Sequence, residues 1–234
     1  MHARDFFSRD LRRYFLPADI MISYSYGTIG AGIAFFQGRR SSTKPTPSSW
    51  SHGAFLIPLL PEKPSTIGIT EATPPRSRVF PLRKYADWKH RIIVARVPHW
   101  TPEDRVRIVA ESSKLLGRRY SFFGIFRAFV DNMIERISWS EKKQSGFRPL
   151  ARLGFDPFGD KFLFCTEFLG RSIAAVTGEE IYPGDPGQAR PFDVWRWLIE
   201  KDAEKILEID RGLVLYPDSH PAGVPLDAAG VPLP

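Results

Sequence analysis

The chain has one cysteine, Cys165, among its 234 residues. A single cysteine excludes an internal disulfide and any metal site built from several cysteines, so the fold depends on packing. With 43% hydrophobic and 13% aromatic residues, a chain of this length can bury a well-packed interior. We therefore expect one globular core, in a protein whose cysteine content suits a reducing compartment.

Cys165 lies where an apolar run meets the predicted start of a helix at residues 165–177, which Gly178 ends. A thiol at the beginning of a helix faces the positive end of the helix dipole, which favours the thiolate. Cys165 is therefore a candidate nucleophile. The alternative is a small hydrophobic side chain in the core, because free cysteine is among the most buried residue types.

Basic residues exceed acidic ones, 33 against 26, and the net charge is +7. Such an excess is either ordinary solvated charge or a surface for an anionic partner, such as a membrane, a cell-wall polymer or nucleic acid. No phosphate-binding loop, zinc-finger spacing or RNA-binding signature accompanies it, so nucleic acid is not favoured. Peripheral contact with an anionic membrane remains open.

The first residues mix charges of both signs and contain no apolar stretch of signal-peptide length. The longest nearly uninterrupted apolar run, residues 29–36, is far shorter than the roughly 20 residues that span a bilayer. We expect no transmembrane segment, and either a cytoplasmic location or delivery by a route that needs no signal peptide.

The predicted fold class is α+β. Strands are expected at residues 19–25, 53–57, 67–72, 79–82 and 91–97. Their spacing, with turns that contain proline, predicts an antiparallel sheet or partial barrel packed against helices. Helices are expected at residues 28–37, 101–116, 122–137, 165–177 and 192–204.

We divide the chain into an N-terminal extension (residues 1–16), a main domain (17–216) and a flexible tail rich in proline (217–234). A helical and basic insertion occupies residues 121–159. Apolar residues of its helix outnumber what one buried stripe uses, and Phe123 and Ile125 fall outside that stripe. We interpret the insertion as the wall and lid of a substrate groove, with a core helix and a surface loop as the alternative.

A cysteine nucleophile needs a base, and that base needs a polar partner to fix its ring. Of five histidines, only His52 opens a predicted core strand. Glu71 stands inside an apolar strand, where an unpaired charge is costly. If these two strands are neighbours, His52 and Glu71 can lie on one face and form a hydrogen bond. The alternatives are a surface histidine and an edge-strand glutamate that faces solvent.

Several short motifs occur in a fixed order over roughly residues 17 to 200. They are Asp19-Ile20, Ser51-His52-Gly53, Glu71-Ala72, Pro81-Leu82, Arg96, Gly117-x-x-Tyr120, Cys165-Thr166-Glu167-Phe168-Leu169 and Pro183-Gly184-Asp185-Pro186. With this ordered set, the chain resembles the circularly permuted papain-like hydrolases. These are relatives of the NlpC-type cell-wall peptidases and the lecithin:retinol acyltransferases, and the likeness is to their YiiX-like branch.

The resemblance implies a permuted papain-like fold in which the histidine precedes the cysteine and the nucleophile begins a helix. It implies that Cys165 is the nucleophile, His52 the general base and acid, and Glu71 the orienting group. A thiol hydrolase that works through an acyl-enzyme needs no metal and no organic cofactor, so we expect neither. The family usually has Tyr-Asp where this chain has Tyr120-Ser121, so the role of that aspartate does not carry over. Glu167 is expected to complement the helix dipole.

The backbone amide of Cys165 is a natural donor to an oxyanion, because it lies at the start of a helix. The resemblance adds an aromatic hydroxyl near the first strand, and Tyr24 and Tyr26 are both candidates. We favour Tyr26, since Gly27 beside it leaves room for a substrate. Tyr120 is a further candidate for substrate contact.

The leading functional hypothesis is a thiol hydrolase or acyltransferase that works through an acyl-enzyme. A lipid acyl ester or amide, such as a phospholipid, is slightly preferred as substrate because a Phe-rich helix precedes a basic segment. The first alternative is an amidase or endopeptidase of cell-wall peptides. The second is a module without catalysis that binds an anionic ligand on its basic surface.

Overall fold

The computed structural model describes residues 2–7, 14–26, 50–58, 67–87, 89–121, 162–182 and 189–215. Within these ranges nine strands form one open sheet in the order β7-β6-β4-β3-β2-β1-β5-β8-β9. The strands are β1 (Ile20–Ser25), β2 (His52–Pro58), β3 (Ile67–Thr73), β4 (Arg76–Pro81), β5 (His90–Arg96), β6 (Arg119–Tyr120), β7 (Phe162–Leu163), β8 (Glu204–Asp210) and β9 (Leu213–Leu215). Neighbouring strands are antiparallel, except for the parallel pair β6 and β7.

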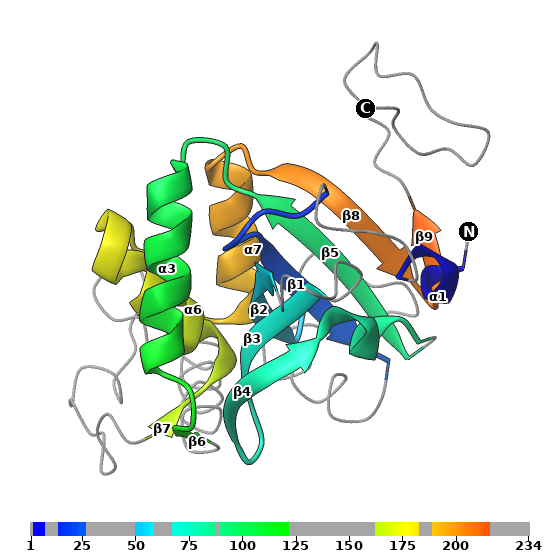
Figure 1. Cartoon of the computed structure of the whole chain (residues 1–234), viewed down its shortest axis with the longest axis horizontal. Coiled ribbons are helices and arrows are strands. Elements are labelled where there is room, and N and C mark those ends of the chain that lie inside the picture. Colours follow the sequence, from blue (N-terminus) through cyan, green and yellow to red (C-terminus); the bar gives the residue numbers. More distant parts are fainter. Residues whose placement is uncertain are drawn as a thin grey trace, which may run out of the picture.

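The helices of the described ranges are α1 (Ala3–Phe6), the 3-10 turn η2 (Leu82–Tyr85), α3 (Pro102–Lys114), α6 (Cys165–Thr177) and α7 (Pro191–Glu200). Helices α3, α6 and α7 gather on one side of the sheet, whereas α1 lies beside β9 at its far end (Figure 1). The architecture is therefore α+β with an open, mainly antiparallel sheet. None of the described helices has the length and apolar character needed to cross a membrane.

The central strands are buried on both faces, and the described residues form two hydrophobic clusters where the sequence led us to expect one core. Alternate residues of the central strands point to opposite faces, as the two-residue period of a strand requires. On one face, Ile20, Phe55 and Ile93 pack with residues of α3, α6 and α7. On the other, Met21 and Leu56 pack with a second cluster that includes residues of α1 and η2. Central strands with two buried faces explain the nearly continuous apolar runs in the sequence.

Helix α6 packs closely against β2 because Gly53 has no side chain. A Cβ atom at Gly53 would lie 2.6 Å from Cδ1 of Leu169, a side chain that is fully buried. This close approach fixes the height of α6 above the sheet, and with it the position of its first residue, Cys165.

The predicted helix at residues 165–177 is confirmed, and it ends at Gly178, whose φ of 71° belongs to the left-handed region. The predicted start of α3 is also confirmed. Thr101 accepts a hydrogen bond from the Asp104 amide, and Asp104 bonds back to the Thr101 amide. Helix α3 itself ends at Lys114, two residues before the predicted end.

The helix predicted at residues 192–204 is too long. Helix α7 ends at Glu200, because Asp202 takes a φ of 49° and the chain enters β8 at Glu204. Strands β8 and β9 were not predicted; they extend the sheet beyond β5. Part of the predicted N-terminal extension packs against the sheet, since Ala3, Phe6 and Phe15 belong to the second core cluster.

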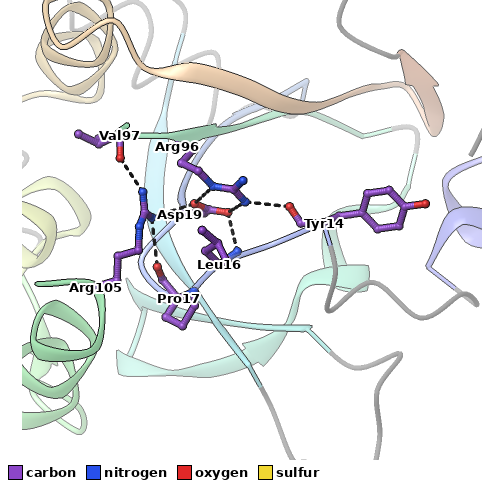
Figure 2. Close-up of polar contacts among 7 residues, drawn as sticks. All are labelled: Tyr14, Leu16, Pro17, Asp19, Arg96, Val97 and Arg105. Carbon is purple, nitrogen blue, oxygen red and sulfur yellow. Dashed lines mark hydrogen bonds and ion pairs between the residues drawn. The ribbon is translucent and has the colours of Figure 1, made fainter. Parts of the chain in front are cut away.

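A buried cluster of charges anchors the start of β1 (Figure 2). The carboxylate of Asp19 accepts hydrogen bonds from Arg96 and from Arg105, at distances of 2.7 to 3.1 Å. The same guanidinium groups also donate to the backbone carbonyls of Tyr14, Pro17 and Val97. The cluster therefore joins the segment before β1 to β5 and α3.

Several predicted features lie outside the described residues. They are the helices at residues 28–37 and 122–137, with Phe123 and Ile125, the basic segment at 138–159 and the tail at 217–234. Their roles stay predictions.

Candidate active site

His52 and Glu71 meet as the sequence suggested. Strands β2 and β3 are antiparallel neighbours with Phe55 opposite Thr70, so the register brings His52 and Glu71 close on the same face. Nε2 of His52 lies 2.7 Å from Oε2 of Glu71. The residue before the histidine holds the strand in place, because the Ser51 amide and hydroxyl both donate to the carbonyl of Ser23 on β1.

Glu71 is fully buried and accepts hydrogen bonds from three side chains, so its charge is well compensated. Besides His52, the ammonium of Lys84 donates to Oε1 at 2.8 Å and the hydroxyl of Tyr85 donates to Oε2 at 2.6 Å. Lys84 and Tyr85 are neighbours on η2. The alternative of an edge-strand glutamate facing solvent is therefore excluded.

Cys165 approaches His52 from the other side of the ring. It is the first residue of α6 and only 4% exposed. It lies near enough to His52 to help raise the pKa of the imidazole. Since Nε2 of the imidazole is bonded to Glu71, Nδ1 is the nitrogen left for the sulfur. The structure thus brings Cys165, His52 and Glu71 together, with His52 bonded to Glu71 and adjacent to Cys165.

The charged groups of this site stabilise one another. Burial alone lowers the pKa of His52, but the negative charges of Cys165 and Glu71 and their hydrogen bonds outweigh burial and raise that pKa to about 10. Burial alone raises the pKa of Glu71, but the hydrogen bond and charge of His52, with Lys84, lower it to about 2. The stable form therefore contains the imidazolium of His52 beside the carboxylate of Glu71.

Two tyrosines border this charged group. Burial and the negative charge of Glu71 raise the pKa of Tyr85 well above its usual value. Burial and the charges of Cys165 and Glu71 likewise raise the pKa of Tyr120, which is 8% exposed. Both hydroxyls consequently keep their protons, and that of Tyr85 donates to Glu71. Tyr120 lies at the end of β6, beside the strand that leads into Cys165.

Tyr24 and Tyr26 lie on or just after β1, and their rings meet edge to face at 5.0 Å. The hydroxyl of Tyr26 donates to Asp210 at 2.6 Å, and Arg211 stacks over the ring. Tyr26 is therefore bound to the β8 end of the sheet, and its role as an oxyanion donor stays a prediction.

Glu167 lies in the first turn of α6, as expected, and forms an ion pair with Arg171 at 2.7 Å. This ion pair joins residues one turn apart on the same helix, which agrees with the expected role of Glu167 within the helix.

Sequence reasoning missed Lys84 and Tyr85. They follow Pro81-Leu82, a motif noted only as a step before a strand. The available signal was Glu71 itself: a carboxylate in an apolar strand needs more than one donor, and the nearest polar residues beyond the next hairpin are Lys84 and Tyr85.

The fold and the site together define an α+β protein with a buried Cys–His–Glu chain at the start of a helix. No family model matches the sequence. The chain is 26% identical over 192 residues to the probable lipoprotein peptidase YaeF of Escherichia coli strain K12, an alignment that covers 78% of this chain. The chain spans 64% of that relative, less than two thirds of its length.

Among solved structures, the chain is similar to the metalloprotein yiiX of Escherichia coli O157:H7. The TM-score is 0.43 and the identity 14%, over 87% of this chain and 89% of the other. The circular permutation stays a prediction.

Proposed function

We propose that the protein is a cysteine hydrolase that cleaves a peptide amide through an acyl-enzyme. The observation that carries the proposal is the buried site in which His52 is bonded to Glu71 and adjacent to Cys165. A thiolate beside an imidazolium is a strong nucleophile near neutral pH, and the adjacent acid is ready to protonate a leaving group.

In the first step, the sulfur of Cys165 attacks the carbonyl carbon and the C–N bond breaks. The proton on His52 goes to the leaving nitrogen, so a neutral amine departs and a thioester remains. In the second step, neutral His52 removes a proton from water, whose oxygen attacks the thioester. The acid leaves, and the thiolate and imidazolium are restored. Glu71 holds the ring and stabilises its charged form throughout.

The negative charge that develops on the carbonyl oxygen needs donors. The amide of Cys165 is one, since the first amides of a helix lack partners within the helix. For the second we propose Tyr120 ahead of Tyr26, because the thiolate's charge acts on Tyr120 whereas the Tyr26 hydroxyl is already bonded to Asp210.

A peptide substrate is supported by the similarity to a protein named as a peptidase. The preference for a lipid acyl substrate rested on residues 122–159, which lie outside the described residues, so no contact supports it. Lipid cleavage therefore becomes an outcome of the test.

The test uses the fact that Cys165 is the only thiol in the chain. The protein is treated with iodoacetamide at pH 6, where free cysteine is mostly protonated. We expect alkylation of Cys165 well above the rate of free cysteine, no labelling in Cys165→Ser, and a much slower rate in His52→Gln. His99→Gln is the matched control, because His99 pairs with Glu179 at the surface, with a side chain 48% exposed.

Turnover is then measured on a panel of peptide amides and of acyl-lipid esters, with intact mass used to detect the acyl-enzyme. Peptide cleavage that disappears in Cys165→Ser supports the proposal. Cleavage of lipids alone would replace the substrate, and a thiol no more reactive than free cysteine would leave only a binding module.

A further inference from the structure

The carboxylate of the proposed triad is held by more than its histidine. Lys84 donates to one oxygen of Glu71 at 2.8 Å, and Tyr85 donates to the other at 2.6 Å. His52 shares that second oxygen at 2.7 Å. Since Glu71 is fully buried, these contacts fix both carboxylate oxygens in place.

The two η2 side chains are themselves held. Tyr85 is only 4% exposed, and its ring lies nearly parallel to that of His52, with centroids 6.4 Å apart and an interplanar angle of 14°. His90 meets the other part of the Tyr85 ring edge to face, at 4.9 Å. The ammonium of Lys84 lies 3.8 Å from the centroid of Phe80, which restricts its movement. Both donors are therefore preorganised.

The charges in the cluster also balance. Cys165 and Glu71 provide two negative charges when ionised, and His52 and Lys84 provide two positive ones. Without Lys84, one imidazolium would face a thiolate and a carboxylate in a largely buried site. Lys84 is 37% exposed, so it supplies this charge without full desolvation.

We propose that Lys84 and Tyr85 are positioning residues for Glu71. In this proposal the positive charge of Lys84 offsets the negative charge of Glu71, so that the positive charge of His52 is left to stabilise the thiolate of Cys165. This inference rests on the proposed function, because it assigns a role to the same site. Neither residue touches the reacting atoms; both act through Glu71.

The groups that face Glu71 come from five neighbouring elements. They are His52 on β2, Lys84 and Tyr85 on η2, His90 on β5, Tyr120 on β6 and Cys165 on α6. Burial, Lys84 and His52 lower the pKa of His90, so His90 adds no competing positive charge at neutral pH. Lys84 is therefore the positive charge whose removal has the most direct effect on the electrostatic potential at Glu71.

The experiment follows the rate of Cys165 alkylation by iodoacetamide from pH 3 to pH 11, a readout that needs no substrate. Removing a positive charge favours proton binding at every neighbouring group. Lys84→Met should therefore shift both inflections of the rate-against-pH profile, the acid one and the alkaline one, to higher pH by about one unit. Lys84→Arg should keep both inflections at their wild-type pH, and Tyr85→Phe should shift them in the same direction as Lys84→Met but by less.

Arg83→Met is the matched control. It removes the same charge from the adjacent residue of η2, but Arg83 is exposed and lines a surface pocket with Arg4 and Phe7. Its profile should equal that of the wild type. Circular dichroism establishes that each variant is folded, and the isosteric Tyr85→Phe variant serves if Lys84→Met does not fold.

Turnover separates positioning from folding. Tyr85→Phe should lower kcat on the order of ten-fold with little change in KM, because the lost hydrogen bond acts on a charged group away from the substrate. If the Lys84→Met and Tyr85→Phe profiles coincide with that of Arg83→Met while the wild-type thiol reacts fast, the inference fails and the proposed function stands. If the wild-type thiol is itself slow, the proposed function fails first.

Discussion

Two buried carboxylates in this molecule are each held by two cationic side chains, yet they serve different purposes. Asp19 is bonded to Arg96 and Arg105, whereas Glu71 is bonded to His52 and Lys84. Arginine stays protonated throughout the range in which proteins fold, and here each guanidinium also donates to a backbone carbonyl. The Asp19 cluster is therefore suited to fixing the chain and not to chemistry.

The Glu71 cluster differs in one partner. His52 can release its proton, and its second nitrogen faces Cys165 rather than a backbone carbonyl. The comparison shows that burial of a charge does not mark a reactive site. What marks it is a partner able to change its own charge.

The largest effect expected on stability comes from breaking the Asp19 cluster. Asp19→Asn leaves Arg105 buried without a carboxylate, which should lower the free energy of unfolding by about 3–5 kcal/mol. Urea unfolding measures the change, and activity per folded molecule should stay close to wild type. The control is Glu111→Gln, since Glu111 pairs with Lys114 at the surface. Equal midpoints for the two variants would contradict the anchoring role.

Breaking the Glu71 cluster should affect turnover more than stability, the reverse of what we expect for the Asp19 cluster. Glu71→Gln keeps a hydrogen-bonding group but removes the charge that favours the imidazolium, so turnover should fall by roughly 10²-fold. The loss of stability should be smaller than for Asp19→Asn. Steady-state kinetics and urea unfolding of both variants test the contrast, which disappears if Glu71→Gln is the less stable of the two.

A smaller effect is expected at Gly53, which lets α6 approach β2. Gly53→Ala brings a methyl group against Leu169 and should cost about 1–3 kcal/mol of stability through overpacking. It should also slow alkylation of Cys165, because the helix that carries the thiol must shift. Gly53→Ala combined with Leu169→Ala should recover the alkylation rate. If Gly53→Ala reacts like the wild type, the packing of Gly53 does not position the thiol.

The smallest expected effect is a change in the free energy of unfolding at acid pH. The pKa of Glu71 is lowered in the folded state to about 2, so its contribution to stability is complete above its usual pKa of 4.5 and declines as the pH falls toward 2. Between pH 4.5 and pH 3 the wild type should lose at most about 2 kcal/mol through this group. The difference in unfolding free energy between wild type and Glu71→Gln should therefore shrink over this range. A constant difference would show that Glu71 titrates alike in both states.

Local signals in the sequence were sufficient for much of the fold. The capping pair of Thr101 and Asp104 and the glycine at position 178 predicted where α3 begins and α6 ends, because these residues act on the backbone beside them. The apolar strands β1, β2, β3 and β5 were found for the same reason.

Strand β8 was missed because its first residue, Glu204, was assigned to the end of the preceding helix. The break depends on the positive φ of Asp202, which the residue type alone does not announce.

The residues of the candidate site also divide into those that the sequence predicted and those that it missed. His52 and Glu71 stood out because each is a polar residue in an apolar strand, and the pairing of β2 with β3 brings them together. Lys84 and Tyr85 lie on a single 3-10 turn with no periodic pattern, and they reach Glu71 only because β4 returns antiparallel to β3. Such contacts depend on the register of a hairpin, which sequence spacing does not determine.

The ends of the sheet also have a consequence for the behaviour of the protein in concentrated solution. Among the described residues, the outermost strands of the sheet are β7, which has two residues, and β9, which has three. The N-terminal segment occupies part of the β9 edge, since His2 bridges to Leu213 and the Ala3 amide donates to Gly212. Edge strands this short offer few unpaired amides and carbonyls to a second molecule. The nine-stranded sheet of the described ranges thus presents little unpaired backbone to a second molecule along β7 and β9, which disfavours edge-to-edge aggregation there.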